Sequence, residues 1–271
     1  MSFLSLIDIS AVMVNSVATG LLSILQISYC SAPTLHIAIG SFGVSIWCAT
    51  CACATILAFN RFIDTTNKSL YYKLFEGRRT YLWFILPIIY FLFFLIFTSP
   101  LIFSQHYMSW FFNPYQDYIE SPIYNRTTDY SNIPHTVNNI LIIILMVIGY
   151  GAMFSGIYKK SHEANVSPTT NGVLVKVQIQ VFVICFFVFA AALLYVYMQF
   201  FVIPPFFTIV SQFLWSFAQG CGGVIYVTLN PTIRKAIVKL FCMRNKRNQV
   251  AQGTSRREVI VTDKGTTPIR I

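Results

Sequence analysis

The sequence has 271 residues, of which 56% are hydrophobic and only 10% are charged, and its mean hydropathy is +0.64. This composition excludes a soluble globular domain and indicates a polytopic membrane protein. The net charge of +10 does not indicate a nucleic-acid partner, because the basic residues lie between the apolar runs, where membrane topology accounts for them.

Six apolar runs are each long enough to cross a hydrocarbon core of ~30 Å as a helix. They are Phe3–Ile27, Leu35–Phe59, Tyr81–Phe103, Ile140–Tyr158, Val177–Val202 and Phe206–Leu229. The second run meets Asn60 and Arg61, where we expect its helix to stop, because arginine is costly inside hydrocarbon. The sequence therefore predicts an all-α transmembrane bundle with six spans.

The basic residues predict the orientation of this bundle. Five Lys and Arg residues lie in Asn60–Thr80, three in Lys159–Lys176 and ten after Leu229, whereas the connection Ser104–Asn139 contains only Arg126. Because positive charge collects on the cytoplasmic side, both chain ends are expected inside and Ser104–Asn139 outside.

Three glycosylation sequons begin at Asn67, Asn125 and Asn165. Only Asn125 falls in the outside connection, so it is the predicted glycosylation site. We expect a multi-pass protein of the plasma membrane.

The chain after the last span has two expected parts. Residues 230–241 carry apolar residues at helical spacing and basic residues elsewhere, which predicts a short helix on the inner membrane surface and closes a bundle domain of residues 1–241. Cys242 follows directly and is either palmitoylated or an unmodified cysteine. Residues 242–271 are polar and are expected to form a disordered cytoplasmic tail.

Few residues within the spans have chemistry of their own. Cys48 and Cys51 have the spacing of a metal or redox pair, but alanines surround them in an apolar helix, so close helix packing is the favoured interpretation. Asp8 lies within a span, where an acid either serves function or marks a helix end near the interface. No enzymatic motif occurs, so we expect no enzyme, catalytic residue, metal site or cofactor.

Four segments together resemble the nematode serpentine receptor class T, a branch of the rhodopsin-like G-protein-coupled receptors. They are Asn60-Arg-Phe62, Leu74-Phe-Glu-Gly-Arg-Arg-Thr80, Phe111-Phe-Asn-Pro114 and Asn230-Pro-Thr-Ile-Arg234. The resemblance runs from about Leu6 to Phe241 and implies that the six spans correspond to helices two through seven. It also implies that helix one is absent and helix two clipped, as in a truncated receptor or an incomplete gene model.

The resemblance assigns roles at the inner ends of the helices. Asn60, Arg61 and Phe62 take the place of the Asp-Arg-Tyr motif that meets the G protein. Because Asn60 is neutral, the nearest carboxylate is Asp64, which we expect to form a weak ion pair with Arg61.

The resemblance also implies a set of residues related to activation. Asp8 takes the place of the mid-helix aspartate of helix two, and Tyr226 takes the place of the tyrosine that closes the helix-seven motif. Glycines replace the asparagine and proline of that motif, which argues against an ion site at Asp8, Thr50 and Gln219.

Helical spacing from Arg61 and Tyr226 points four residues toward the bundle interior, where a ligand would bind. They are Gly43, Trp47, Gln212 and Ser216. Trp47 is expected to be either the floor of the pocket or a helix-packing residue.

The outside connection is rich in aromatic residues and is expected to form either a lid over the pocket or an anchor to the headgroups. These residues are Tyr107, Trp110, Phe111, Phe112, Tyr115 and Tyr118.

The expected function is that of a chemosensory receptor. Its partners are a small-molecule ligand, a heterotrimeric G protein and the lipid bilayer, and the resemblance implies a location in sensory neuron cilia. A six-helix channel or transporter and a nonfunctional truncated receptor are the alternatives. The channel or transporter is disfavoured by the lack of repeats and by the single intramembrane acid.

Overall fold

The structure is a computed structural model that describes residues 2–115, 130–162, 168–201 and 204–229, together with 234 and 238–239. Only the backbone is described at 2, 153, 157–162, 168–178, 180, 225–227 and 229. The chain divides into two units, Met1–Gly223 and Val224–Ile271, and the helix bundle belongs to the first.

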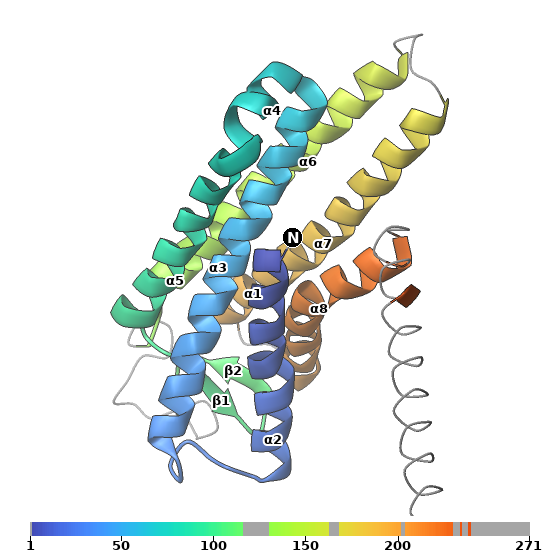
Figure 1. The fold of residues 1–271 in the computed structure, drawn as a ribbon. Helices are drawn as coiled ribbons and strands as arrows, with labels where there is room; N and C mark the ends of the chain where they lie inside the picture. The colour runs from blue at the N-terminus through green and yellow to red at the C-terminus, as the bar shows by residue number, and fades with distance from the viewer. Residues whose placement is uncertain are drawn as a thin grey trace, which may run out of the picture. The chain divides into compact units, whose positions relative to one another are not determined.

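The described chain is a bundle of helices with one small hairpin, which confirms the predicted fold class (Figure 1). The elements are α1 (Ser2–Val12), η1 (Met13–Ala18), α2 (Thr19–Ile24), α3 (Pro33–Thr66), α4 (Lys68–Phe75), η2 (Gly77–Phe84), α5 (Ile85–Phe97), β1 (Ile102–Ser104), β2 (Ser109–Phe111), α6 (Ile133–His162), α7 (Pro168–Phe200) and α8 (Pro205–Leu229).

Five described helical segments are long and apolar enough to cross a membrane, so the protein is a multi-pass membrane protein. They are Phe3–Ile24, Pro33–Thr66, Gly77–Phe97, Ile133–Gly156 and Val181–Phe200. The sixth predicted span forms the helix α8, but the glutamines Gln212 and Gln219 and a group of glycines lower its hydropathy, and it does not join the other five.

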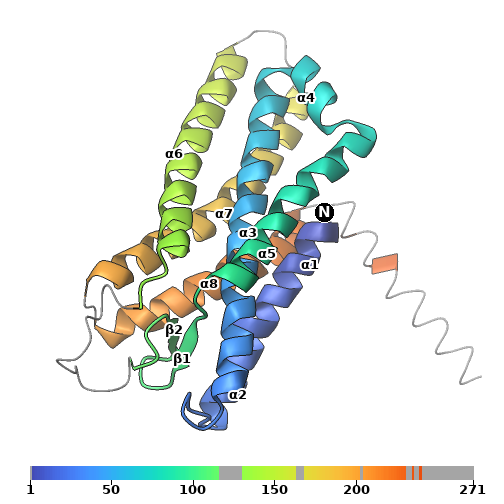
Figure 2. The ribbon, with the colours of Figure 1, turned by 90° about the vertical axis from the view of Figure 1, so that its left-hand side faces the viewer.

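Helix α3 is the centre of the bundle. It contacts α1, α5, α6 and α7, and it lies between α5 and α6 in Figure 2. Its buried face consists largely of small residues such as Gly43, Cys48 and Cys51, which let neighbouring helices approach closely. Cys48 and Cys51 belong to the main hydrophobic core, as the packing interpretation predicted.

Helix α3 does not stop at Asn60 and Arg61 but continues to Thr66, so the predicted helix end is wrong. Asn67 then takes an extended conformation, and its side-chain oxygen accepts the Leu70 backbone N–H at 3.0 Å, which starts α4. The connection Asn60–Thr80 is therefore mostly helical. We define this end of the bundle, with α4 and η2, as the Arg61 end.

The third predicted span is shorter than the sequence indicated. The helix α5 ends at Phe97, because Pro100 disfavours helical geometry at Ser99. The chain then forms an antiparallel hairpin that pairs Ile102 with Phe111. We define this side of the bundle as the hairpin end; it lies at the opposite end of α3 from α4 (Figure 1).

Gly40 allows the hairpin to sit tightly on α3. A Cβ atom at this position would lie only 1.7 Å from the carbonyl oxygen of Leu101, the residue before β1. Only glycine fits this contact without moving the backbone.

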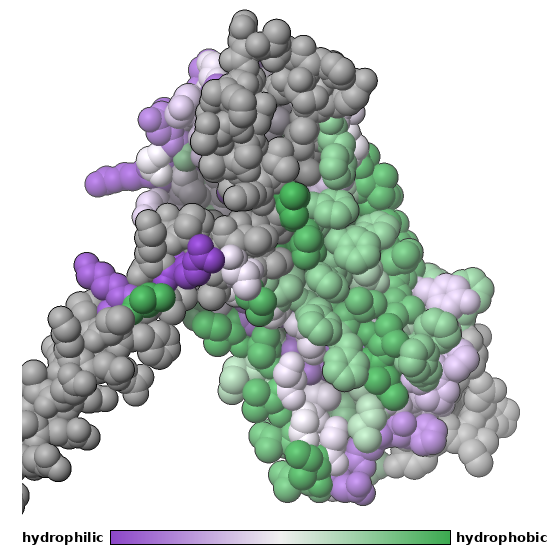
Figure 3. Space-filling view, turned by 90° about the vertical axis from the view of Figure 1, so that its right-hand side faces the viewer, coloured by the Kyte–Doolittle hydropathy of each residue, from purple (hydrophilic) through white to green (hydrophobic). Residues whose placement is uncertain are grey.

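The outer surface carries the large apolar residues that face lipid. Helix α5 alone exposes Ile85, Leu92 and Phe97, and Figure 3 shows apolar residues across the middle of another face, with hydrophilic ones nearer its lower, hairpin end. A wide apolar belt of this kind suits a hydrocarbon environment.

Candidate functional site

An aromatic cluster lies inside the bundle toward the hairpin end. The Trp47 and Trp215 rings meet edge to face at 6.4 Å, and the Tyr195 ring meets Trp215 in the same way at 6.2 Å. A cavity of about 10 Å³ is lined by Trp47, Leu101, His135, Tyr195 and Trp215. Trp47 therefore both packs between helices and lines a cavity.

Asn139 fixes the position of Trp47. Its Oδ1 atom accepts the indole N–H of Trp47 at 2.9 Å and an amide N–H of Asn138 at 3.0 Å. Its Nδ2 atom lies 3.4 Å from Nε2 of His135. A hydrogen-bonded chain thus joins α3 to the first turns of α6.

The other three residues predicted to bind ligand do not line this cavity. Gly43 packs close to Val14 and Trp215. Gln212 donates to the backbone oxygen of Asn15 at 2.5 Å, and Ser216 interacts with Ser16 at 3.3 Å. All three are directed into the bundle, as predicted. Gln212 and Ser216 form hydrogen bonds that join α8 to the first helix.

The first helix receives these contacts at a wide turn. Residues Met13–Ala18 form a π-helix, in which Asn15 is fully buried. The wider turn rearranges the backbone hydrogen bonds, so Thr19 Oγ1 donates to the Val14 carbonyl at 3.2 Å and the Asn15 carbonyl accepts Gln212. Such turns occur often at functional sites.

The hairpin reaches into the bundle and closes its end. The indole N–H of Trp110 donates to Thr19 Oγ1 at 2.9 Å, and Thr208 donates to the Tyr107 carbonyl at 2.9 Å. Phe112 meets the His135 ring edge to face at 5.0 Å. Of the aromatic residues in this connection, Trp110 is a core residue, and Tyr118 lies outside the described residues.

The structure joins two of the predicted activation residues. Thr50 donates to Oε1 of Gln219 at 3.1 Å, which links α3 to α8 in the interior. Asp8 lines a second cavity together with Thr50 and Gly222. In the part of the chain that the structure describes, no group of three metal-ligating side chains occurs. The Tyr226 side chain lies outside the described residues.

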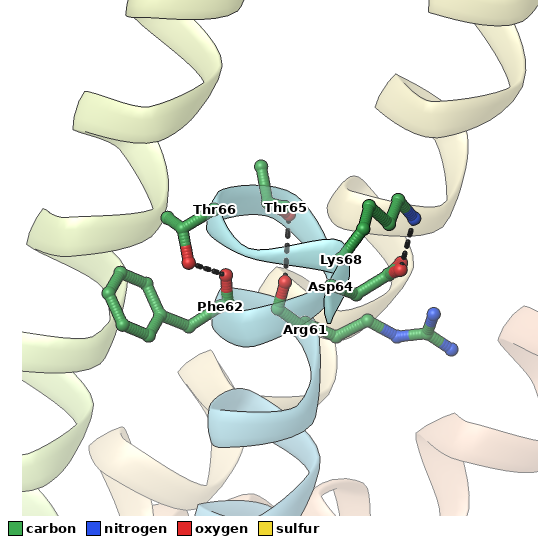
Figure 4. A network of polar contacts seen from close by, with 6 residues as sticks. All are labelled: Arg61, Phe62, Asp64, Thr65, Thr66 and Lys68. Atoms are coloured by element: carbon green, nitrogen blue, oxygen red, sulfur yellow. Dashed lines mark hydrogen bonds and ion pairs between the residues drawn. The ribbon is translucent and has the colours of Figure 1, made fainter. Parts of the chain in front are cut away.

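At the Arg61 end, the predicted ion pair between Arg61 and Asp64 is wrong. Asp64 pairs with Lys68 instead (Figure 4). The extended Asn67 ends α3 and places Lys68 at the start of α4, where its ammonium group reaches the Asp64 carboxylate.

Arg61 is half-buried, on the same side of α3 as the pair between Asp64 and Lys68 (Figure 4). Its Nε atom is buried without a hydrogen-bond partner among the described residues. The neighbouring backbone is held locally, because Thr65 donates to the Arg61 carbonyl at 2.7 Å and Thr66 to that of Phe62 at 2.8 Å. Arg61 thus lies in the last two turns of α3, with one buried side-chain donor that has no partner among the described residues.

Sequence reasoning missed His135, Asn139, Tyr195 and Trp215 as site residues. The first two lie in α6, which begins at Ile133 rather than at the predicted Ile140. Polar residues recur at helical spacing through Asn132, His135, Thr136 and Asn139, and this periodicity is the signal that could have extended the helix. The predicted glycosylation and palmitoylation sites, Asn125 and Cys242, lie outside the described residues.

Comparison with known proteins shows which family this sequence is similar to. The family model described as the serpentine type 7TM GPCR chemoreceptor Srt matches residues 1–250. Serpentine receptor class T-55 of Caenorhabditis elegans is 25% identical over 256 residues, which cover 93% of this chain and 67% of that protein. No solved structure matches.

Proposed function

Because the chain belongs to the Srt family of serpentine chemoreceptors, we propose that it binds a small chemical cue at the hairpin end and activates a heterotrimeric G protein at the Arg61 end. The observation that carries this proposal is the connected interior. A cavity lies below the hairpin, and Arg61 lies at the far end of the same central helix.

Hydrogen bonds across the interior support a route between the two ends. Trp47 bonds to α6 through Asn139, and one turn further along α3 Thr50 bonds to α8 through Gln219. A ligand that shifts Trp47 therefore moves α3, and this movement changes the hydrogen bonds that α3 makes to α6 and α8. Ligand binding biases the helix arrangement only to the extent that the ligand prefers one arrangement.

The orientation of the receptor follows from the same proposal. The Arg61 end carries the basic connections and faces the cytoplasm, with residues 230–241 on the inner membrane surface and 242–271 as a tail, and the hairpin end faces outside. A chemical cue outside the cell then meets the hairpin first, which suits the plasma membrane of a sensory cilium. The family is one of receptors, so we propose no enzymatic activity.

The test replaces Arg61 and measures GTP exchange on purified G protein in membranes that hold matched amounts of receptor. Arg61→Ala is expected to abolish receptor-dependent exchange. The control is Arg78→Ala, which removes an exposed cation at the same end. Unchanged exchange with Arg61→Ala, or an equal loss with Arg78→Ala, contradicts the assigned role of Arg61.

A further inference from the structure

The wall of the cavity beside Trp47 contains buried polar atoms that lack a hydrogen-bond partner among the described residues. Trp215 is 2% exposed and His135 is 5% exposed, and both line this cavity. The Nε1 atom of Trp215 and the Nδ1 atom of His135 are buried without a hydrogen-bond partner among the described residues. The hydroxyl oxygen of Tyr195, which lines the same cavity, is a third such atom. Buried polar atoms in folded proteins nearly always have a partner, so three in one cavity point to a bound group.

The neighbouring hydrogen bonds decide which atoms donate. An indole N–H can only donate, so the Asn139 atom that contacts Trp47 at 2.9 Å is the amide oxygen. The amide nitrogen of Asn139 is then the atom that lies 3.4 Å from His135 Nε2, which must accept. A neutral histidine that accepts at Nε2 carries its proton at Nδ1. Both unpartnered nitrogen atoms are therefore donors, and the Tyr195 hydroxyl can either donate or accept.

The residues that line the cavity indicate the charge of its ligand. None of the five described residues that line the cavity carries a carboxylate, an ammonium or a guanidinium group. Burial of an ion here would lack a counter-charge, and the two free donors would repel a cation. The three aromatic rings favour a compact apolar body.

We propose that this cavity binds a small uncharged molecule through an acceptor atom, a carbonyl oxygen or a ring nitrogen, which receives the hydrogen bonds of Trp215 and His135. The proposal rests on the proposed receptor function and names the class of its ligand. The present volume of about 10 Å³ is close to that needed by one water, so such a molecule enters only when a wall moves. Leu101, next to β1, is the wall that the hairpin segment supplies.

The test uses the full chain, purified in detergent, and measures thermal stabilisation against ligand concentration. The probes are cyclohexanone, acetophenone and pyridine, each paired with an acceptor-free compound of similar shape: methylenecyclohexane, α-methylstyrene and benzene. At least one acceptor compound is expected to stabilise the protein at concentrations about tenfold or more below its partner.

Two variants locate the effect. Trp215→Phe keeps a ring but removes one of the two donors, and it is expected to reduce the preference for the acceptor compound. Trp83→Phe is the matched control, since the indole of Trp83 bonds to the Leu74 carbonyl at the other end of the bundle. This control should keep the preference.

The proposal is overturned if the acceptor-free partners bind equally well, if the preference is unchanged in Trp215→Phe, or if no probe stabilises the protein. It is also overturned if cyclohexylammonium binds better than cyclohexanone. Binding of cyclohexylammonium together with GTP exchange leaves the receptor function intact and refutes only the ligand class. Selective binding of cyclohexanone without GTP exchange supports the ligand class and refutes only the receptor function.

Discussion

Asn139 shows how one polar side chain organises the interior of a membrane bundle. Its amide oxygen accepts two N–H groups and its nitrogen faces His135, so three side chains take their orientation from one residue. No water competes for such bonds inside a helix bundle, and each donor left unpaired carries the full cost of its burial. The position of Trp47 is therefore set by a hydrogen bond as much as by packing.

We predict that Asn139→Leu destabilises the protein by about 1–3 kcal/mol, because it leaves the buried Trp47 and Asn138 donors without an acceptor. Thermal unfolding in detergent measures this loss. Trp47→Phe in the same background should then cost less than it does in the wild type, by about 1 kcal/mol. Additive losses would show that the bond between Trp47 and Asn139 contributes little.

The pair between Asp64 and Lys68 makes a second prediction about single residues. Lys68→Ala should release Asp64 to contact Arg61, which stabilises the resting receptor and lowers ligand-independent GTP exchange by up to about twofold. Asn60→Asp should also lower it, by placing a carboxylate next to Arg61. In Lys68→Ala/Asp64→Ala the exchange should return to the wild-type level; a persistent decrease would mean that Lys68 acts on the G protein directly.

Among the elements, the hairpin is the part that joins the outside connection to the core. Trp110 ties it to the first helix, Thr208 ties it to α8, and Leu101 lies against α3 at Gly40. Its strands have only three residues each, so these contacts rather than the strand pairing hold it in place.

We predict that Gly40→Ala destabilises the protein by about 1–3 kcal/mol, since the added methyl group would overlap the Leu101 carbonyl and push the hairpin away. Gly20→Ala is the matched control, because nothing lies within 4 Å of the added atom in α2. That change should be neutral or slightly stabilising. Equal effects of the two substitutions in thermal unfolding would show that the hairpin is not held at Gly40.

The element that the sequence predicted best is α8, since the predicted span Phe206–Leu229 nearly coincides with the helix Pro205–Leu229. Hydropathy failed where polar residues are buried: it started α6 seven residues late, at Ile140 instead of Ile133, because His135 and Asn139 read as a loop. Hydropathy also missed the hairpin, because Ile102 and Phe103 of β1 are apolar and were assigned to the end of the third span. Trp215 was not predicted as a site residue, because the residues that its ring contacts, Trp47 and Tyr195, are distant in sequence.

For the whole molecule, charge and architecture give the same division into two ends. The central helix α3 leads from the hairpin contact at Gly40 to the basic connection after Arg61. Eighteen of the nineteen Lys and Arg residues lie in the connections assigned to the Arg61 end and in the segment after Leu229, and the exception is Arg126. Moving such a cluster across a bilayer is costly, so the charge distribution favours one orientation.

We predict that the chain carries a single N-linked glycan, at Asn125, because only this sequon lies in the connection assigned to the outside. Endoglycosidase treatment of the protein expressed in animal cells should increase its mobility on a gel, and Asn125→Gln should remove this shift. Asn67→Gln and Asn165→Gln serve as controls and should leave the shift unchanged, since both sequons fall in connections that the charge distribution assigns to the inside. If the shift survives Asn125→Gln and disappears with either control, the hairpin end faces the cytoplasm, and a cue from outside could not reach the Trp47 cavity in the way proposed.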